Sequence, residues 1–386
     1  MRLWIGQGVS FLGDGVSMVA LVVLIVQITG SASAVGGALV ARLLPTIASP
    51  LAGVLADRLD RRVVLVASDL ARAVLALGLI FVRDLVILYV LVFLMGLART
   101  IFNPTIRAAF PGVVGGGDLT RANALISGTF SVSETVGPAL GGLLVATVGV
   151  NAAFALDCAT YLVSAAFLFR VPLSRPRRDE DGDLARELKA GFTYLAGARM
   201  PLAIVVGAFL TMLTINTTIP AEVFLAKETF DAGDAGYGLL VGLWGGGMIL
   251  GSAMIAALGD RVNLALFYFL AIFVSALALV GTSLSPTFVL ALVALTIAGI
   301  ANGIDEVTAN TILQKRVPDA LLGRVFAVRY LGFSAGDVLA FLLGGMIVDA
   351  VGTRLAYLFA GVATAVVGLL VLLLVTTTAF VRSRSG

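Results

Sequence analysis

Twelve apolar runs follow one another along the chain, and each has about the length that crosses a lipid bilayer. They lie at residues 4–28, 34–56, 63–82, 85–109, 123–148, 151–171, 201–226, 236–259, 263–282, 286–310, 325–350 and 354–380. A transmembrane α-helix needs roughly 20 predominantly apolar residues. The pattern therefore predicts an all-α membrane protein of twelve transmembrane helices, with short loops and little room for a soluble domain.

One long polar stretch divides the apolar runs into two sets of six. We therefore predict an N-terminal six-helix bundle over residues 1–171, a cytoplasmic linker over 172–200 and a C-terminal six-helix bundle over 201–386. A helix is expected in the linker, because apolar residues recur on one face after a possible N-cap at Asp183: Leu184, Leu188, Phe192 and Leu195. Such a helix can lie on the inner membrane surface, and a solvated tether is the alternative.

The basic residues are distributed unevenly between the two sides that twelve spans would create. With the N-terminus in the cytoplasm, only Arg83, Lys227 and Arg354 fall in outer loops. Cytoplasmic loops carry an excess of lysine and arginine. The pattern therefore predicts that both termini lie in the cytoplasm, and it independently favours an even number of spans.

An internal repeat relates the two halves at a constant offset of 203 residues. Glycines and charged residues coincide without a gap, including Gly30 with Gly233, Asp57-Arg58 with Asp260-Arg261, Gly96 with Gly299, Glu134 with Asp337, and Gly149 with Gly352. Six spans are an even number, so both halves enter the membrane with the same polarity. This predicts two parallel repeats about an axis along the membrane normal, with a solute site near the midplane between them.

The loop between the second and third spans carries a glycine, an aspartate and several arginines in close order: Gly53, Asp57, Arg58, Arg61 and Arg62. This segment resembles the loop signature of the major facilitator superfamily. The resemblance implies a latch at the inner face, in which the carboxylate interacts with a helix N-terminus or an arginine and releases during transport. The alternative is a solvated loop that obeys the positive-inside rule.

A second motif, Gly137-Pro138-Ala139-Leu140-Gly141-Gly142, lies in the fifth span. It resembles the antiporter signature of the drug–proton exchangers of the same superfamily. Proline bends a helix, and glycines four residues apart let a neighbouring helix approach closely. The resemblance implies a pliable seal that favours exchange over leak, and ordinary packing of small residues is the alternative. Packing is the interpretation we prefer for the glycines of the eighth span, which include Gly238, Gly242, Gly247 and Gly251.

Further segments narrow the resemblance to one branch of the superfamily. They are Leu3-Trp4-Ile5-Gly6-Gln7, Gly13-Asp14, Arg42-Leu43-Leu44-Pro45, Asn103-Pro104 and Arg121-Ala122-Asn123-Ala124-Leu125. Together they resemble the twelve-span drug:proton antiporters that include macrolide and siderophore exporters. The resemblance covers nearly the whole chain and implies a multi-pass transporter of the bacterial cell (inner) membrane.

Ionisable side chains within the spans are candidates for function, because a charge at bilayer depth is costly. The candidates for binding protons or substrate are Asp14, Arg42, Glu134, Glu222, Asp305, Glu306 and Asp337. We rank Asp14 and Glu134 highest, because a desolvated carboxylate that faces a cavity can take up a proton. Asp157 is a further acid within a span.

Each of these acids also has a structural alternative. Asp69 and Arg72 are three residues apart and are expected to form a structural charge pair. The pair of Asp14 and Arg42 is compatible with either a functional site or a structural charge pair. For Asp305 and Glu306, the structural alternative is solvent exposure in an inner vestibule.

Composition removes several other classes of function. The chain has no histidine and one cysteine, Cys158, so we expect no metal site, no disulfide and no cofactor. It has no phosphate-binding glycine loop of the type that ATP-driven proteins carry.

We therefore predict a secondary active transporter, not an enzyme, that exports amphipathic small molecules by alternating access in exchange for protons. Its expected partners are membrane lipid, a small-molecule substrate and protons, with no nucleic acid, and we expect a monomer. The alternatives are a dedicated exporter of a metabolite, siderophore or lysolipid, an importer, a membrane enzyme, or a membrane sensor that no longer transports.

Overall fold

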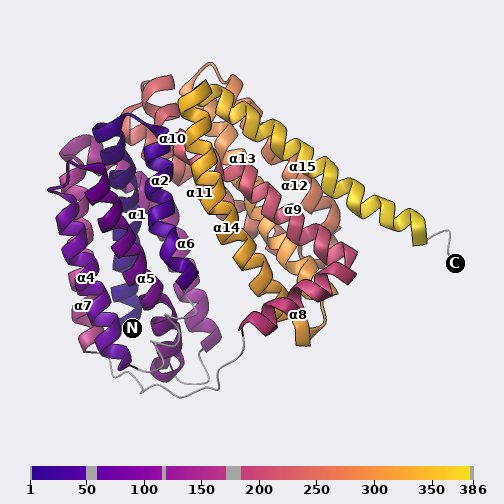
Figure 1. Ribbon diagram of the computed structural model, residues 1–386, viewed down its shortest axis with the longest axis horizontal. Coiled ribbons are helices and arrows are strands. Elements are labelled where there is room, and N and C mark those ends of the chain that lie inside the picture. Colours follow the sequence, from indigo (N-terminus) through magenta and orange to yellow (C-terminus); the bar gives the residue numbers. More distant parts are fainter. Residues whose placement is uncertain (1, 49–58, 115–118, 171–183, 383–386) are drawn as a thin grey trace. The chain divides into compact units, whose positions relative to one another are not determined.

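The structure is a computed structural model that describes residues 2–48, 59–114, 119–170 and 184–382. Helices occur at all twelve positions where the sequence predicts a span (Figure 1). The first half contains α1 (Arg2–Thr29), α2 (Ala32–Leu43), η1 (Leu44–Ala48), α4 (Arg61–Leu79), α5 (Leu85–Val114), α6 (Leu119–Val148) and α7 (Val150–Phe169). The second half contains α8 (Leu184–Gly197), α9 (Arg199–Asn216), α10 (Ile219–Phe224), η2 (Leu225–Thr229), α11 (Gly233–Leu258), η3 (Gly259–Arg261), α12 (Leu264–Leu284), α13 (Phe288–Arg316), α14 (Asp319–Val351) and α15 (Thr353–Arg382).

Ten of the described helical segments are long and apolar enough to cross a membrane. The two remaining predicted spans correspond to α2 with η1, part of whose span lies outside the described residues, and to α4. The latter is set apart by its charges, which are Arg61, Arg62, Asp69 and Arg72. The seventh span is not one continuous helix, because α9 ends at Asn216 and α10 restarts with Pro220 in its first turn, where the missing N–H of proline costs nothing.

The internal repeat is visible in the backbone at the same offset as in the sequence. α4 and α12 begin 203 residues apart, as do α5 and α13, and the C-terminal ends of α6 and α14 have the same separation. Gly30 and Gly233 have φ of 63° and 66°, and Gly149 and Gly352 have φ of 100° and 84°. A positive φ is accessible to glycine without steric cost. These matched glycines therefore mark equivalent chain reversals in the two halves.

Other matched glycines bring helices into backbone contact. A Cβ atom at Gly96 would collide with the carbonyl oxygen of Arg42, and one at Gly299 would collide with that of Trp244. A Cβ at Gly141 would lie 2.7 Å from the carbonyl oxygen of Val16. Close approach of small residues is a general means of holding helices together where lipid surrounds them.

The helices group into two compact units. Unit 1 comprises Met1–Glu180 with Ala226–Gly242, and unit 2 comprises Asp181–Leu225 with Leu243–Gly386. In unit 1, α1 packs on α6 and α7, and α4 packs on α5 and α7. The domain boundaries expected from the sequence stay a prediction.

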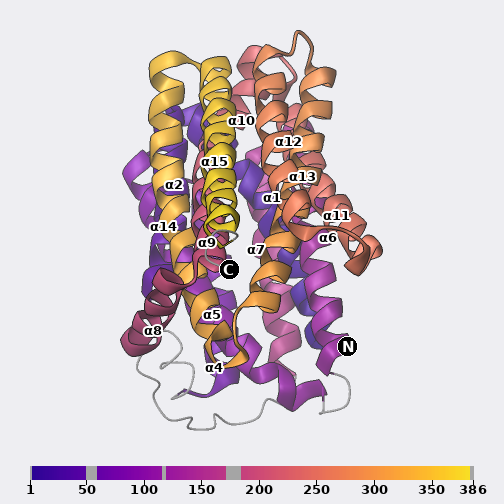
Figure 2. The same ribbon diagram turned by 90° about the vertical axis from the view of Figure 1, so that its right-hand side faces the viewer.

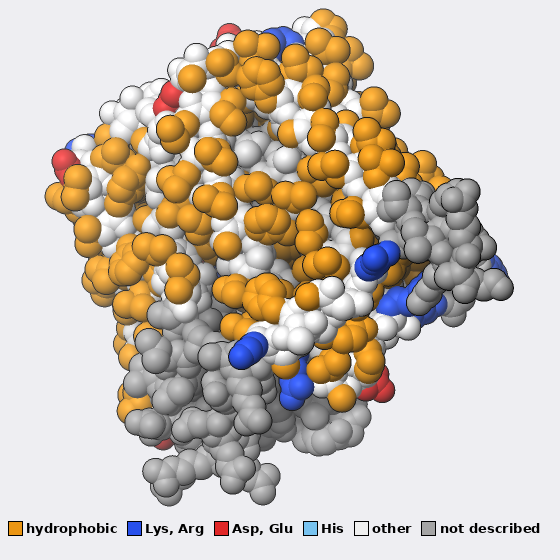
Figure 3. All heavy atoms as spheres, turned by 45° about the vertical axis from the view of Figure 1, so that its right-hand side comes forward, with side chains coloured by type: hydrophobic (Ala, Val, Ile, Leu, Met, Phe, Trp, Pro, Cys, Tyr) orange, Lys and Arg blue, Asp and Glu red, His pale blue; other side chains and the backbone are white. Residues whose placement is uncertain are grey.

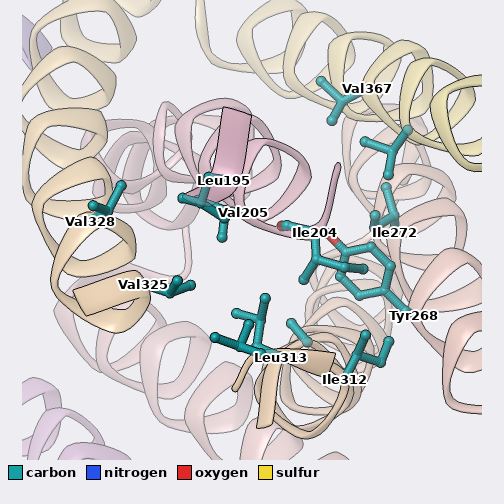
Figure 4. Packing of buried hydrophobic residues seen from close by; sticks show 13 residues of the cluster. Leu195, Ile204, Val205, Tyr268, Ile272, Ile312, Leu313, Val325, Val328 and Val367 are labelled. Carbon is teal, nitrogen blue, oxygen red and sulfur yellow. Dashed lines mark hydrogen bonds between the residues drawn. The ribbon is translucent and has the colours of Figure 1, made fainter. Parts of the chain in front are cut away.

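The core of unit 2 is an apolar cluster that draws on α8, α9, α12, α13, α14 and α15 (Figure 4). Leu195 of the linker helix α8 is buried in it at 2% exposure, and Leu188 packs against it, whereas Phe192 is 53% exposed. Gly191 lies against the backbone of Arg324, so α8 runs beside α14 (Figure 2). The linker helix is thus docked on unit 2 through one apolar face and is not solvated on all sides, while Asp183 lies outside the described residues.

Hydrophobic side chains predominate on the face drawn in Figure 3, and the charged ones gather toward its ends. Many large apolar side chains are exposed, including Phe81 at 76% and Leu277 at 70%. Exposed apolar surface on this scale is typical of helices that face hydrocarbon.

We predict that Gly141→Ala lowers the stability of the protein by about 1–3 kcal/mol, because the added methyl group overpacks the contact with Val16. Gly128→Ala, in the same helix, is the matched control. No atom lies within 4 Å of the position its Cβ would take, and alanine favours a helix by about 0.5–1 kcal/mol over glycine. Thermal unfolding in detergent measures both, and equal midpoints for the two variants would contradict the packing argument.

Candidate functional site

A cluster of charged side chains is buried inside unit 1. Asp14 lies on α1, Asp69 and Arg72 on α4, and Asp157 and Tyr161 on α7. The exposed fraction is 0% for Asp69 and Asp157, 2% for Tyr161, 4% for Arg72 and 8% for Asp14. Charges this far from water are retained only with partners that offset their desolvation.

Arg72 is the centre of the cluster on the α4 side. It forms an ion pair with Asp69, one turn away on the same helix, as the sequence predicts. Its guanidinium also lies over the rings of Phe102 at 4.4 Å and Tyr161 at 4.5 Å from the centroids. Arginine is suited to such a place, because its planar group can pair with a carboxylate and stack on aromatic rings together.

Asp14 is the acceptor on the α1 side. The Tyr161 hydroxyl donates a hydrogen bond to its Oδ1, and the positive charges of Arg99, Arg72 and Arg42 act on it. Arg42, which the sequence suggested as its neutralising partner, has its Nη1 2.6 Å from the sulfur of Met18. Asp14 is therefore stabilised by a hydrogen bond from Tyr161 and by the charges of several arginines, and not by Arg42 alone.

A small cavity lies between these groups. Its volume is about 30 Å³, and its polar lining comes from Asp14, Ser17, Arg42, Arg72, Arg99 and Tyr161. A cavity of this size with several polar neighbours can hold a water molecule. The cavity is therefore too small for an organic solute, but it is large enough for a water molecule that carries a proton.

Asp157 is the residue of this cluster to which sequence reasoning gave no role. Its Oδ1 faces the Thr160 hydroxyl at 3.5 Å. Its Oδ2 is buried without a hydrogen-bond partner among the described residues. A Cβ atom at Gly13 would lie 2.8 Å from Asp157 Oδ1. The glycine before Asp14 thus leaves room for a second carboxyl beside the first, and the four-residue spacing of Asp157 and Tyr161 was the available signal.

Unit 2 contains a separate charge network. Arg329 donates from Nη2 to Glu306 Oε2 at 2.6 Å and from Nη1 to Asn310 Oδ1 at 2.7 Å. Asp305, next to Glu306, is 8% exposed, and its Oδ1 is buried without a hydrogen-bond partner in the described part of the chain. Solvent exposure, the sequence-based alternative for both acids, is therefore wrong for Asp305. α13 extends to Arg316, so this pair lies deeper in its helix than the predicted span end at 310 suggested.

The other predicted acids lie apart from the unit 1 cluster. Glu134 is exposed on α6, because Ser133 on the same helix turns toward α1 and leaves its neighbour on another face. Glu134 is therefore not part of the buried cluster, and its role in binding protons or substrate stays a prediction. Asp337 accepts a hydrogen bond from Asn216 Nδ2 at 2.7 Å, and Glu222 is half-buried in α10.

The loop motif between the second and third spans is covered only in part. Gly53, Asp57 and Arg58 lie outside the described residues, and Arg61 and Arg62 open α4. Asp60, to which the sequence analysis gave no role, caps this helix by accepting from the backbone N–H groups of Arg62 at 2.8 Å and Val63 at 3.3 Å. An acidic N-cap at this point fixes where the helix begins.

The glycines of the fifth-span motif make the close contacts that their spacing predicts. A Cβ at Gly137 would lie 2.9 Å from Gly15 Cα on α1, next to Asp14. A Cβ at Gly142 would lie 2.7 Å from Gly238 Cα in the part of α11 that belongs to unit 1. Pro138 lies between them inside α6. The motif therefore holds α1 and α11 against α6, and its part in exchange stays a prediction.

Comparison with solved structures supports the architecture. The nucleoside transporter NupG superimposes with a TM-score of 0.78 at 12% identity, covering 97% of this chain and 98% of that one. The chain thus has the fold of that structure, and the predicted all-α fold with repeated halves is confirmed.

Sequence comparison identifies the family. Residues 1–382 match the transmembrane secretion effector family, and the chain belongs to this family of the major facilitator superfamily. A candidate bacilysin exporter, BacE of Bacillus amyloliquefaciens, is 29% identical and covers 92% of this chain and 90% of its own. Macrolide efflux protein A of Streptococcus pyogenes is 24% identical with 93% and 91% coverage. The enterobactin exporter EntS of Escherichia coli O1:K1 / APEC is 27% identical with 83% and 76% coverage. The chain is therefore a multi-pass transporter of an export family, and the predicted resemblance is confirmed.

We predict that Asp69→Asn lowers the free energy of unfolding by about 3–5 kcal/mol, because it leaves Arg72 as a buried charge without its direct partner. Asp234→Asn is the matched control: the Lys227–Asp234 pair is 2.6 Å long but its side chains are 25% and 18% exposed, so its loss is expected to cost about 1 kcal/mol or less. Unfolding in detergent measures both changes. A loss for Asp69→Asn no larger than the control's would show that the buried pair does not hold α4 in place.

Proposed function

We propose that this protein exports amphipathic small molecules in exchange for protons, by alternating access. The observation that carries the proposal is the buried cluster of unit 1, in which Asp14, Asp69 and Asp157 lie among arginines. Asp14 and three arginines, Arg42, Arg72 and Arg99, line its water-sized cavity. Such a cluster is costly to maintain for packing alone, because apolar side chains would fill the same volume without desolvation. The export family supplies the direction of transport.

Proton exchange is the form of energy coupling that these residues support. Burial disfavours the charged form of a carboxyl group, so a small change in its surroundings is enough to add or remove a proton. The chain has no histidine, and carboxyl groups are therefore the available proton carriers. Movement of the helices during alternating access supplies the change in surroundings.

The proposed substrate class follows from the relatives. Their names assign them the export of bacilysin, macrolides and enterobactin, three different small molecules. We propose a macrolide-like or multidrug range for this chain, with a single dedicated metabolite as the narrower outcome. We also propose the bacterial cell membrane as its location and cytoplasmic termini, because the basic residues favour that orientation.

The test is transport by purified protein reconstituted in lipid vesicles. We predict that a pH gradient drives accumulation of erythromycin, used as the macrolide probe, and that a protonophore abolishes it while a sodium gradient alone has no effect. Bacilysin and enterobactin, tested in parallel, distinguish a broad substrate range from a single dedicated substrate. Equal movement of all the compounds with and without the pH gradient would contradict proton exchange.

A further inference from the structure

The three aspartates of the unit 1 cluster differ sharply in their partners. Asp14 accepts from the Tyr161 hydroxyl and faces three arginines. Asp69 is tied to Arg72 by an ion pair, although its second oxygen has no hydrogen-bond partner among the described side chains. Asp157 has the weak contact of its Oδ1 with Thr160 at 3.5 Å and the Ser17 hydroxyl beside it, and its Oδ2 has no hydrogen-bond partner among the described residues. Of the three, Asp157 alone has neither an ion pair with an arginine nor a hydrogen bond from the tyrosine.

The surroundings of Asp157 can be stated element by element. Asp14 and Ser17 face it from α1, and the Ser17 hydroxyl donates to the backbone oxygen of Asp14 at 3.2 Å. Arg42 of α2 and Arg72 of α4 also act on it, and Tyr161 lies one turn along its own helix and donates its hydrogen bond to Asp14. Asp157 therefore has a second carboxyl group beside it on α1, and like charges close together are unfavourable.

The charges of the cluster balance when all three aspartates are ionised. Arginine stays protonated in proteins, so three ionised aspartates would balance Arg42, Arg72 and Arg99. One added proton therefore gives the cluster a single positive charge. Arg42 and Arg99 are half-buried. The change of charge therefore alters the electrostatic potential at the edge of the cluster as well as in its interior.

We propose that Asp157, and not Asp14, is the carboxyl group that takes up and releases the exchanged proton, an inference that rests on the proton exchange proposed above. Asp14 stays ionised as the fixed counter-ion of the arginines. On uptake, a hydronium ion loses one O–H bond as an O–H bond forms at Asp157 Oδ2, and on release the new bond breaks and the proton returns to water. The small cavity has room for such a water molecule, and it is lined by Asp14 and Ser17, the two residues of α1 that face Asp157.

Gly13 has a defined part in this arrangement. Because a Cβ at position 13 would lie 2.8 Å from Asp157 Oδ1 and would collide with the Thr160 hydroxyl, only glycine lets α1 and α7 bring the two carboxyl groups together. The pairing of a fixed and a titrating carboxylate thus depends on the helix contact itself. A movement of α1 against α7 during transport would change the distance between them and, with it, the proton occupancy of Asp157.

The test separates active transport from passive exchange in lipid vesicles, with erythromycin as probe. We predict that Asp157→Asn loses accumulation driven by a pH gradient but retains exchange of labelled for unlabelled probe, at a rate that no longer depends on pH. Asp14→Asn loses both activities, because the arginines lose their acceptor. Glu228→Gln, an exposed carboxyl at the end of η2, is the matched control and behaves as wild type.

A conservative variant covers the case in which Asp157→Asn does not fold. Asp157→Glu keeps a titrating group, and it is expected to retain driven accumulation with a pH profile displaced from that of wild type. A coincident profile, or driven accumulation by Asp157→Asn equal to wild type, would overturn the assignment. Loss of pH dependence in Asp14→Asn with exchange retained would assign the proton to Asp14 instead. Wild-type exchange that ignores the pH gradient would remove the proposed function, and the inference with it.

Discussion

The cost of removing charge from water is the constraint on which the structure depends. Unit 1 keeps Asp69 and Asp157 fully buried and Arg72 nearly so, and this is tolerable only because opposite charges and aromatic faces lie in contact. Asp69 forms a direct ion pair with Arg72. Asp14 accepts a hydrogen bond from the Tyr161 hydroxyl and interacts with several arginines. The third, Asp157, is left with the least compensation. An incompletely compensated carboxyl is unfavourable for stability, and it is the kind of group whose protonation a small movement can change.

The repeat supplies the scaffold, whereas the chemistry breaks its symmetry. Matched glycines at turns and helix crossings give both halves equivalent backbones. At the positions 203 residues beyond Asp14, Arg72 and Asp157, however, the second half has Thr217, Ser275 and Ala360. Unit 2 instead carries its own network around Arg329 on α13 and α14. The two halves therefore share a way of packing helices but not the charged residues of the unit 1 cluster.

Much of the fold could be predicted because its signals are local. The length and spacing of apolar runs indicated the helices, and paired glycines indicated the repeat. The Asp69–Arg72 pair was predictable because three residues separate its members on one helix. The role of Asp157 could not be predicted in this way, because it depends on a contact between α1 and α7 that joins distant parts of the chain. The surroundings of Glu134 could not be predicted for a related reason: its position along the span was clear, but which face of α6 it occupies depends on how that helix packs against α1.

The most direct measurement is infrared difference spectroscopy of the purified protein between alkaline and acidic buffer, without any substrate. A carboxyl group that gains a proton acquires the carbonyl absorption of the neutral acid, and exchange of that residue between aspartate and glutamate shifts its frequency. We expect a band that shifts in Asp157→Glu and keeps its frequency in Asp14→Glu. A band that shifts in Asp14→Glu and not in Asp157→Glu would contradict it.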